Sequence, residues 1–367
     1  MKTSRLIIGM GAICTITFVS LLFIRHNGIV PSSANVTVSG SKTVAGNGAA
    51  NLDDAVRNLQ ARIARCPKDA SLHFELSALY RSSNMPKEAI YEINKAIELG
   101  KPEERAFYFG FLADMQLDIG NKAEALKAYR EALRAANQLY VGKWSDTNGP
   151  MNWRNMGIKL YASKYAFEAG KILQGSSRYK EAEQSYERAL VLIVSYCAPI
   201  QAIRNQNQNV MVNVLDPLEL RNKTWLCLQD VQDKLKTSRP SRQWVSSQIP
   251  AFQWSRQNAT PETEKMVEDV ERCRVNAGPA LHGIVAGYYL QSGQFENAVI
   301  QYLAQIEKEP DSYEPLRGLG YTYVLQGRLD EAIEAYDKAI VLGDDGSKAL
   351  VDKVKRARTA YAKRTRK

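Results

Sequence analysis

Apolar residues recur every three or four positions along most of this chain, and alanines on two of these stripes return after 34 residues. Ala55 is followed by Ala89, and Ala298 by Ala332. Residues at such spacings share one face of an α-helix. A unit of this length, made of two short antiparallel helices, cannot bury its apolar faces alone, so copies must stack. The pattern therefore predicts an all-α fold, a superhelical solenoid of helix pairs.

The clearest copy runs from Tyr313 to Gly346. Gly320 in its first helix and Ala332 in its second are small, which lets the two helix axes approach where they cross. We expect Gly327 to end the first helix, because glycine adopts a positive φ without strain. The positions on the shared faces are Leu316, Leu319, Gly320, Tyr323, Ala332, Tyr336 and Ala339.

Further copies keep these offsets less completely, and a lone second helix with Ala55, Leu59 and Pro67 precedes them. The matching residues are Val285, Ala286, Tyr289, Gly293, Ala298 and Tyr302; Leu76, Ser77, Tyr80, Ala89, Ile93 and Ala96; Leu112, Ala113, Gly120, Ala125, Tyr129 and Ala132; and Ala169, Gly170, Ala182, Tyr186 and Ala189. Gln305 departs from the pattern at a small position. In these residues the chain resembles the tetratricopeptide repeat (TPR) family over about 52–134, 163–194 and 279–346.

This resemblance implies a right-handed superhelix with a concave groove that binds peptides or partner domains. Family members that grip a C-terminal carboxylate use a clamp of Lys, Asn and Arg, which the groove positions here do not supply. The groove is small, apolar and aromatic, which favours a helix or an extended apolar peptide. The alternative is that its glycines only allow tight helix stacking. The candidate groove residues are Phe74, Ala78, Phe107, Phe111, Asp114, Gly283, Gly287, Arg317 and Tyr321.

An uncharged, mainly apolar run extends from Leu6 to Ile24. At 1.5 Å per residue it spans about 28 Å, close to the hydrocarbon core of a bilayer. Arg25 follows at once, without a small-residue cleavage site, so we expect a transmembrane anchor; a cleaved signal peptide is the alternative. The solenoid is then expected on the periplasmic or lumenal side, as in a membrane-anchored protein of bacterial type.

These patterns divide the chain into segments, with a flexible Gly- and Ser-containing linker after the anchor. The expected segments are a cytoplasmic N-terminus at 1–5, the anchor at 6–24, the linker at 25–51, an N-terminal repeat array at 52–134, an irregular third repeat at 135–194, a helical insertion at 195–276, a C-terminal repeat pair at 277–346, and a basic capping helix and tail at 347–367.

The insertion loses the repeat register but predicts helices of its own. Asp216 before Pro217 and Thr260 before Pro261 are helix starts, since Asp and Thr cap a free N–H and Pro fits the first turn. The stripes that follow are Trp225, Leu228, Val231 and Leu235, then Met266, Val270 and Cys273. Between them, 239–257 is expected to be a loop whose Trp244 and Trp254 either pack internally or contact a partner.

Four cysteines lie beyond the apolar run, at Cys66, Cys197, Cys227 and Cys273. In an oxidising compartment they permit two disulfides in three pairings, and buried free thiols are the alternative. A bridge between Cys227 and Cys273 would staple the insertion.

Most of the formal net charge of +10 lies at the C-terminus, where nine Lys and Arg residues from Ser347 onward face Asp352 alone. The apolar stripe Leu350, Val354, Ala357 and Tyr361 predicts a capping helix. Its basic face either meets solvent or binds anionic lipid headgroups or an acidic partner, with Arg364, Arg366 and Lys367 as candidate contacts. Nucleic acid is not expected as a partner.

The sequence contains no recognisable constellation for catalysis. His73 and His282 share one position of the repeat, which favours stacking over metal ligation, and His26 abuts the apolar run. Glu181, Glu187, Asp330 and Glu331 are expected on solvent-facing helix surfaces. We therefore expect no enzyme and assign no cofactor or metal.

Together these patterns indicate a membrane-tethered scaffold or adaptor that binds other proteins through its groove and assists assembly of an envelope complex. Two alternatives stay open. One is an envelope enzyme or glycan-processing accessory with a site in 195–276, and the other is a secreted soluble binding protein.

Overall fold

The computed structural model describes residues 48–139, 153–206 and 216–366. Every regular element in these ranges is helical, which confirms the predicted all-α class. The chain divides into two compact units. Unit 1 comprises Met1–Leu139 with Ile203–Asp216, and unit 2 comprises Tyr140–Ala202 with Pro217–Lys367.

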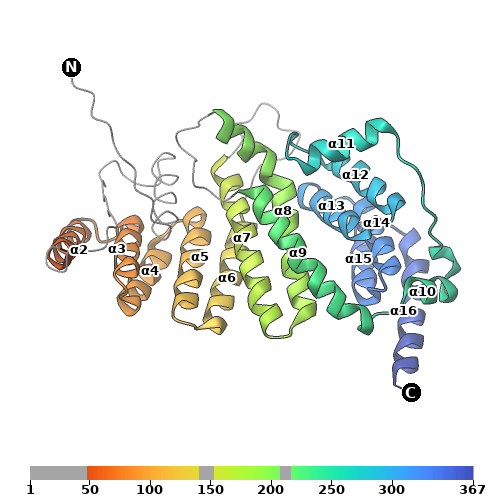
Figure 1. Cartoon of the computed structure of the whole chain (residues 1–367), viewed down its shortest axis with the longest axis horizontal. Helices are drawn as coiled ribbons and strands as arrows, with labels where there is room; N and C mark the ends of the chain where they lie inside the picture. The colour runs from red at the N-terminus through yellow and green to blue at the C-terminus, as the bar shows by residue number, and fades with distance from the viewer. Residues whose placement is uncertain (1–47, 140–152, 207–215, 367) are drawn as a thin grey trace. The chain divides into compact units, whose positions relative to one another are not determined.

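Unit 1 is a run of helices in which each packs against the next in sequence (Figure 1). Its helices are α2 (Gly48–Arg65), α3 (Ala70–Ser82), α4 (Pro86–Leu99), α5 (Pro102–Asp118) and α6 (Lys122–Asn137). Asp69 caps α3 by accepting a hydrogen bond from the Ser71 N–H at 3.0 Å. Helices α4 and α5 each begin with proline in the first turn, where no intrahelical N–H is lost. Helix α2 is the predicted lone second helix, and it begins before the expected boundary at 52.

Unit 2 contains a long hairpin, the insertion and the C-terminal repeats. The hairpin consists of α7 (Trp153–Gly175) and α8 (Tyr179–Gln206). The insertion forms α9 (Pro217–Leu235), η1 (Lys236–Ser238), α10 (Arg242–Gln248), η2 (Pro250–Phe252) and α11 (Pro261–Glu271). The repeats follow as α12 (Pro279–Ser292), α13 (Phe295–Lys308), α14 (Glu314–Leu325) and α15 (Leu329–Val341), and α16 (Gly346–Thr365) packs on α15.

In four repeats the second helix buries the stripe that the sequence predicts, whereas in α13 Ala298 is buried and Tyr302 is half-buried. The fully buried members are Ala89, Ile93 and Ala96 in α4, Ala125, Tyr129 and Ala132 in α6, Ala182, Tyr186 and Ala189 in α8, and Ala332, Tyr336 and Ala339 in α15. Helix α16 buries Val354 and Ala357 as predicted, but it buries Val351 in place of the expected Leu350, which is half-buried. The apolar periodicity was sufficient to identify these buried sides. Each of them packs against a helix that is close in sequence, either the other helix of the same repeat or, for the last repeat, the capping helix α16.

Two glycines of the first helices sit directly on a tyrosine ring of the second helix in the same repeat. A Cβ built on Gly170 of α7 would lie 2.5 Å from the ring of Tyr186, and one on Gly320 of α14 would lie 2.8 Å from the ring of Tyr336. Real Cβ atoms do not approach aromatic carbons this closely, so these positions must be glycine for the helix pairs to keep their spacing.

A buried ion cluster joins α8 to the turn between α14 and α15. Arg328 in that turn is only 2% exposed. It donates two hydrogen bonds to the Glu187 carboxylate of α8, one of them at 3.2 Å, and its guanidinium lies 3.7 Å from Glu183. Arg239 donates two further hydrogen bonds to Glu183. Burial opposes ionisation of Glu183, but Arg328 and Arg239 outweigh it and lower its pKa.

A second polar cluster lies on Glu307 of α13. Lys159 of α7 approaches one carboxylate oxygen of Glu307 at 3.2 Å, and Arg188 of α8 donates to the other at 2.8 Å. Tyr196 of α8 donates to Glu307 at 3.2 Å. Burial of the neighbouring Lys308 lowers its pKa to about 8. Both clusters therefore attach the C-terminal repeats to the α7–α8 hairpin by paired, desolvated charges.

The Arg328 cluster corrects the expectation that Glu187 and Glu331 face solvent. Glu187 is 5% exposed, and Glu331 lies 3.3 Å from the Arg328 guanidinium. The prediction was wrong because helical periodicity finds the side of α8 that faces its own hairpin partner and is blind to a second neighbour from a distant part of the chain.

The insertion helices begin where the sequence predicted. Helix α9 starts at Pro217, and α11 starts at Pro261 with Thr260 as its cap, whose Oγ1 accepts the Thr263 N–H at 3.3 Å. Two details of the prediction were wrong. The expected loop contains α10 and η2, and Val267 is buried where Met266 was expected, with Met266 40% exposed.

The cysteine prediction is corrected in one respect. Cys66 and Cys227 are free thiols, whereas Cys273 is disulfide-bonded, so the bridge between Cys227 and Cys273 is not formed. Among the helices of the described ranges, none has both the length and the apolar character that spanning a bilayer requires. The expected anchor at 6–24 lies outside these ranges.

The glycine contacts can be tested with a matched pair of substitutions. Gly320→Ala forces a methyl group into Tyr336, whereas a Cβ on Gly287 of α12 would meet no described atom within 4 Å. Alanine favours the helix at both positions by up to about 1 kcal/mol, so the difference in unfolding free energy between the variants isolates the overpacking cost, about 1–3 kcal/mol. All five tryptophans belong to unit 2, so urea unfolding followed by their fluorescence reports this unit. Equal midpoints for the two variants would contradict the contact.

Removing the buried guanidinium should be far more damaging than removing an exposed one. Arg328→Leu leaves two carboxylates buried with one cation fewer, and should lower the unfolding free energy of unit 2 by about 3–5 kcal/mol. Arg178, just before α8, forms a bidentate pair with Glu181 in the first turn of that helix, and the two side chains are 45% and 43% exposed; Arg178→Leu removes this pair. It should cost less than about 1 kcal/mol. The idea is wrong if the two variants unfold at similar urea concentrations.

Candidate protein-binding groove

The predicted groove residues come from the first helices of the repeats, and they divide between the two units. Helices α3 and α5 of unit 1 carry Phe74, Ala78, Phe107, Phe111 and Asp114. Helices α12 and α14 of unit 2 carry Gly283, Gly287, Arg317 and Tyr321. The sequence predicted one groove, whereas its candidate residues form two sets, one in each unit.

The unit 1 set is an aromatic cluster between α3 and α5. The ring of Phe74 lies edge-on to Phe107 and Phe111, with centroids 5.3 and 5.1 Å apart. Phe74, Ala78 and Phe111 are buried, whereas Phe107 is half-buried. Most of the cluster is therefore buried, and Phe107 is the member with the most accessible surface.

Polar groups border this cluster. The Arg81 guanidinium lies 4.9 Å from the centroid of Phe111 and donates a hydrogen bond to Asp118 at 2.8 Å. Asp114 accepts a hydrogen bond from the Tyr129 hydroxyl of α6 at 2.5 Å. Asp114 thus ties the two helices of its repeat together, which the sequence did not predict.

The glycines of α12 differ from each other. A Cβ on Gly283 would lie 3.0 Å from the amide oxygen of Gln305 in α13, so Gly283 provides room for the residue that departs from the repeat pattern. Gly287 faces open space next to Ile284, which is 48% exposed. Gly283 therefore serves the tight packing of neighbouring helices, which was the alternative to a binding role, whereas the surface at Gly287 is open to a partner.

On α14, both candidate side chains have partners within the chain. Arg317 lies 3.6 Å from Asp344. Tyr321 stacks on Phe252 of η2 with centroids 5.3 Å apart, and its hydroxyl donates to the Gln253 carbonyl at 3.3 Å. The insertion therefore covers the groove position of the last repeat.

Residues 240–257, which we call the strap, make this contact and continue across the repeat ends. The Trp254 indole donates a hydrogen bond to the Leu290 carbonyl at 2.7 Å, and the Gln257 N–H bonds to the Gln291 carbonyl at 3.1 Å. Val245, Ile249 and Phe252 belong to the core of the C-terminal repeats. The strap is thus an integral part of unit 2.

Two left-handed glycines accept the strap. Gly293 has φ +81 and Gly327 has φ +72, which confirms the positive φ expected for Gly327. A Cβ on Gly293 would lie 2.9 Å from the Trp254 ring, and one on Gly327 would lie 2.2 Å from the Pro240 carbonyl oxygen. Both turns need glycine for two reasons. The backbone has a positive φ there, and a Cβ at either position would collide with the strap.

The two candidate tryptophans pack within unit 2. Trp254 lies edge-on to Phe295 with centroids 5.4 Å apart and carries the Arg242 guanidinium 4.9 Å from its ring. Trp244 lies edge-on to Tyr361 of α16, with ring centroids 5.2 Å apart. Both are half-buried, so their remaining edges stay accessible, but their main contacts are internal. No local pattern could find these contacts, because they join segments that are distant in sequence.

Two segments of the chain match a known repeat family. The tetratricopeptide repeat profile matches residues 286–347 in unit 2 and residues 108–139 in unit 1. The chain contains tetratricopeptide repeats. No curated protein matches this chain.

Several solved structures are similar to this TPR-containing chain at low identity. A TPR protein from Parabacteroides merdae is 12% identical, with 93% of this chain and 98% of that chain covered and a TM-score of 0.31. YrrB, described as a TPR protein with an unusual peptide-binding site, is 16% identical, with 81% and 97% covered and a TM-score of 0.28. MamA is 14% identical, with 55% and 98% covered and a TM-score of 0.30. At these values the similarity carries no argument about what the TPRs bind.

The two histidines in the TPR first helices occupy equivalent repeat positions, although His282 is fully buried and His73 is 12% exposed. Nδ1 of His73 lies 2.7 Å from Glu92, and Nδ1 of His282 lies 2.7 Å from Gln301; each partner is on the second helix, 19 residues later. Their role in pairing the helices of a TPR follows directly from this geometry. Within the described ranges, no group of three potential metal ligands occurs.

Unit 2 should lose stability in mild acid because of His282. Burial, assisted by Lys308, lowers the pKa of His282 from 6.5 to about 4. Below pH 6.5 the unfolded chain therefore binds a proton that the folded chain refuses, so stability falls as the pH drops. Between pH 6.5 and 5 the loss should be about 2 kcal/mol.

The pH dependence can be assigned with matched variants. His282→Gln should flatten the dependence of the tryptophan-monitored urea midpoint on pH, because glutamine does not titrate. His73→Gln, at the equivalent TPR position of unit 1, should leave that dependence intact. Identical pH profiles for wild type and His282→Gln would exclude His282 as the cause.

Proposed function

We propose that this protein is a membrane-tethered TPR scaffold that binds another protein and assists assembly of a complex at a cell envelope. TPRs generally mediate protein–protein interaction, and both units carry them. The observation that carries the proposal is the aromatic face between the first helices of unit 1, which combines a rigid apolar floor with bordering charges.

The chemistry of that face favours an apolar helix or an extended apolar segment as the ligand. Phe107 offers a half-buried ring edge-on to Phe74, and aromatic rings are effective interface anchors because they bury large areas at little entropic cost. Arg81 and Asp118 at the border add hydrogen-bonding groups that can fix the orientation of a ligand. A carboxylate-gripping clamp is not what these residues resemble.

In unit 2 the corresponding face is narrower. Because the strap packs on Tyr321, the open part of this face is around Ile284 and Gly287 of α12.

The tether is proposed from the apolar run at 6–24, and the tail from the charge of α16. The candidate side chains Arg364 and Arg366 are exposed at the end of α16. A basic exposed helix end attracts anionic headgroups, at about 1 kcal/mol per side chain near the surface. Lys367 would add to this attraction but lies outside the described residues.

The binding proposal can be tested in the full-length protein by placing a photo-crosslinking amino acid at Phe107. We expect it to capture a specific protein in the native membrane fraction, because this ring is the accessible part of the aromatic face. The matched control is the same amino acid at Glu98, an exposed position of α4. Equal, unspecific labelling from both positions would contradict the proposal.

The same material tests the tether. Full-length protein should sediment with membranes, and removal of residues 2–24 should release it. Neutralising Arg364, Arg366 and Lys367 in the shortened chain should abolish any remaining binding to vesicles that contain anionic lipid. Recovery of the full-length protein in the soluble fraction would rule out anchoring.

A further inference from the structure

A tyrosine recurs on the buried stripe of the TPR second helices, and in α13 this tyrosine lacks the partner that it has elsewhere. In unit 1 the Tyr129 hydroxyl of α6 donates to Asp114 of α5, which stands 15 residues earlier. In α13 the corresponding tyrosine is Tyr302, and Gly287 of α12 stands 15 residues before it. Because glycine has no side-chain acceptor, the first helix of this TPR leaves the Tyr302 hydroxyl without that partner.

A second polar group lies beside it on α13. Gln305 follows Tyr302 by three residues, so the two share a face of the helix, and it stands where the other copies carry alanine. Its amide oxygen would lie 3.0 Å from a Cβ on Gly283 of α12, and the Tyr302 ring would lie 2.6 Å from a Cβ on Gly318 of α14. Both side chains are half-buried, and neither forms a hydrogen bond with any residue that the structure describes. We call Tyr302 and Gln305 the polar pair.

The surface beside the polar pair is open. A Cβ on Gly287 would meet no described atom within 4 Å, so the backbone of a ligand can approach α12 closely there. Ile284, three residues earlier on α12, is 48% exposed and offers an apolar contact. In the last TPR the residue that corresponds to Gly287 is Tyr321, which the strap covers, and the Tyr336 hydroxyl below it is enclosed. The polar pair is therefore the accessible member of the two.

The polar pair lies in a neutral setting, which decides the ligand that it suits. Burial raises the pKa of Tyr302, and no charged group of the described residues contributes to that shift. A carboxylate would be desolvated here without a cation, which is unfavourable. A helix uses its own backbone groups internally, whereas an extended peptide presents free N–H and C=O groups. The Gln305 amide can both donate to and accept from such a backbone.

Unit 2 already binds one extended segment through its backbone. Residues 253–260 of the strap are not helical. The Tyr321 hydroxyl donates to the Gln253 carbonyl at 3.3 Å, and the Gln257 N–H donates to the Gln291 carbonyl of α12 at 3.1 Å. Gln291 stands one helical turn after Gly287, so the strap ends beside the open surface and leaves the polar pair to another chain.

We infer that the polar pair binds the backbone of an extended segment of a partner protein. One peptide carbonyl of that segment accepts from the Tyr302 hydroxyl, a peptide group pairs with the Gln305 amide, and an apolar side chain covers Ile284. Neighbouring side chains on one helix face have Cβ atoms about 5–6 Å apart, and like-facing groups of a strand recur after about 7 Å. One strand can therefore reach both groups. The inference rests on the proposed role in protein binding and specifies the ligand of the unit 2 face.

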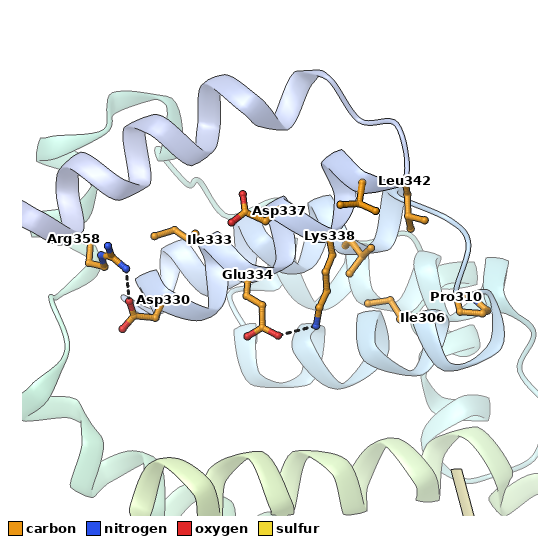
Figure 2. Close-up of a pocket in the computed structure, with 11 residues that line it drawn as sticks. Ile306, Pro310, Asp330, Ile333, Glu334, Asp337, Lys338, Leu342 and Arg358 are labelled. Carbon is orange, nitrogen blue, oxygen red and sulfur yellow. Dashed lines mark hydrogen bonds and ion pairs between the residues drawn. The ribbon is translucent and has the colours of Figure 1, made fainter. Parts of the chain in front are cut away.

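The outer side of the same repeats provides a contrasting surface. Figure 2 shows the shallow depression along α15, where Arg358 pairs with Asp330 at 3.0 Å. Lys180 of α8 lies 3.7 Å from the same carboxylate, so this charge is met within the chain. Val341, which also lines the depression, is 84% exposed. It is suitable as an accessible control position.

The test uses the full-length protein with a photo-crosslinking amino acid at Ile284, irradiated in its native cells, and the crosslinked peptides are identified by mass spectrometry. We expect one dominant segment from another protein. The same amino acid at Val341 should not capture that segment. A synthetic peptide of the segment then serves as the probe for affinity measurements.

The variants remove the hydrogen-bonding groups one at a time. Tyr302→Phe and Gln305→Ala should each weaken peptide binding about five- to tenfold. Gly287→Asp supplies the acceptor found at this repeat position in α5. It should weaken binding at least about tenfold without lowering the urea midpoint of unit 2, which separates occlusion from unfolding. Tyr186→Phe is the matched control, since that hydroxyl is bonded within the α7–α8 hairpin at 2.6 Å, and it should bind like wild type.

Methylating the backbone nitrogens of the peptide one at a time separates backbone recognition from side-chain recognition. We expect one position at which the methyl group weakens binding to wild type at least about tenfold, with a much smaller effect on Gln305→Ala. If replacing one Asp or Glu of the peptide by Ala removes binding while no methyl group does, the ligand is an acidic side chain and the inference is overturned.

Each remaining result has a defined meaning. Crosslinks from Ile284 to this chain itself would replace the partner by a second copy and overturn the inference, as would an absence of crosslinks there. Equal affinity of the peptide for wild type, Tyr302→Phe and Gln305→Ala would reject the polar pair. If Ile284 fails while Phe107 captures a protein, the proposed scaffold function stands and only this site is rejected; failure at both positions rejects both.

Discussion

The Arg328 guanidinium, held between Glu187 and Glu183 of α8, is the interaction on which the arrangement of unit 2 depends. Burying three charges in a protein interior costs several kcal/mol per ion, which only close pairing offsets. The cluster therefore tolerates one relative position of α8 and the α14–α15 turn. With that turn fixed, Gly327 lies where the Pro240 carbonyl reaches it, and the strap can pack across the repeat ends.

This constraint shapes where a partner can bind. The strap places Phe252 on Tyr321, so the last TPR presents little of its first-helix face. The large hydrophobic side chains that unit 2 leaves exposed in its described residues are Ile284 of α12, Val341 at the end of α15, and Leu226 and Met266 of the insertion. Unit 1 has no such cover among its described residues, and its aromatic face keeps the chemistry expected of a TPR groove.

The parts of the fold that depend on local chemistry were predicted well from sequence. The stripe of Ala332, Tyr336 and Ala339 and the starts of α9 and α11 follow from helical spacing, capping and proline, all of which act within a few residues. The errors share a cause. Glu187 looked solvent-facing, 239–257 looked like a loop, and Cys227 looked like a partner for Cys273, because each depends on neighbours far away in sequence.

By itself the sequence determined that this protein is built from TPR helix pairs, which faces those helices bury, and which turns require glycine, since periodicity and backbone sterics are local properties. The apolar run at 6–24 remains a prediction of the same local kind. Only the tertiary structure decided that an arginine and a glutamate 141 residues apart would be buried together, and that the insertion would fill the last groove position. Desolvated charge pairs and strap contacts form when distant segments meet, and no spacing within one helix encodes that meeting.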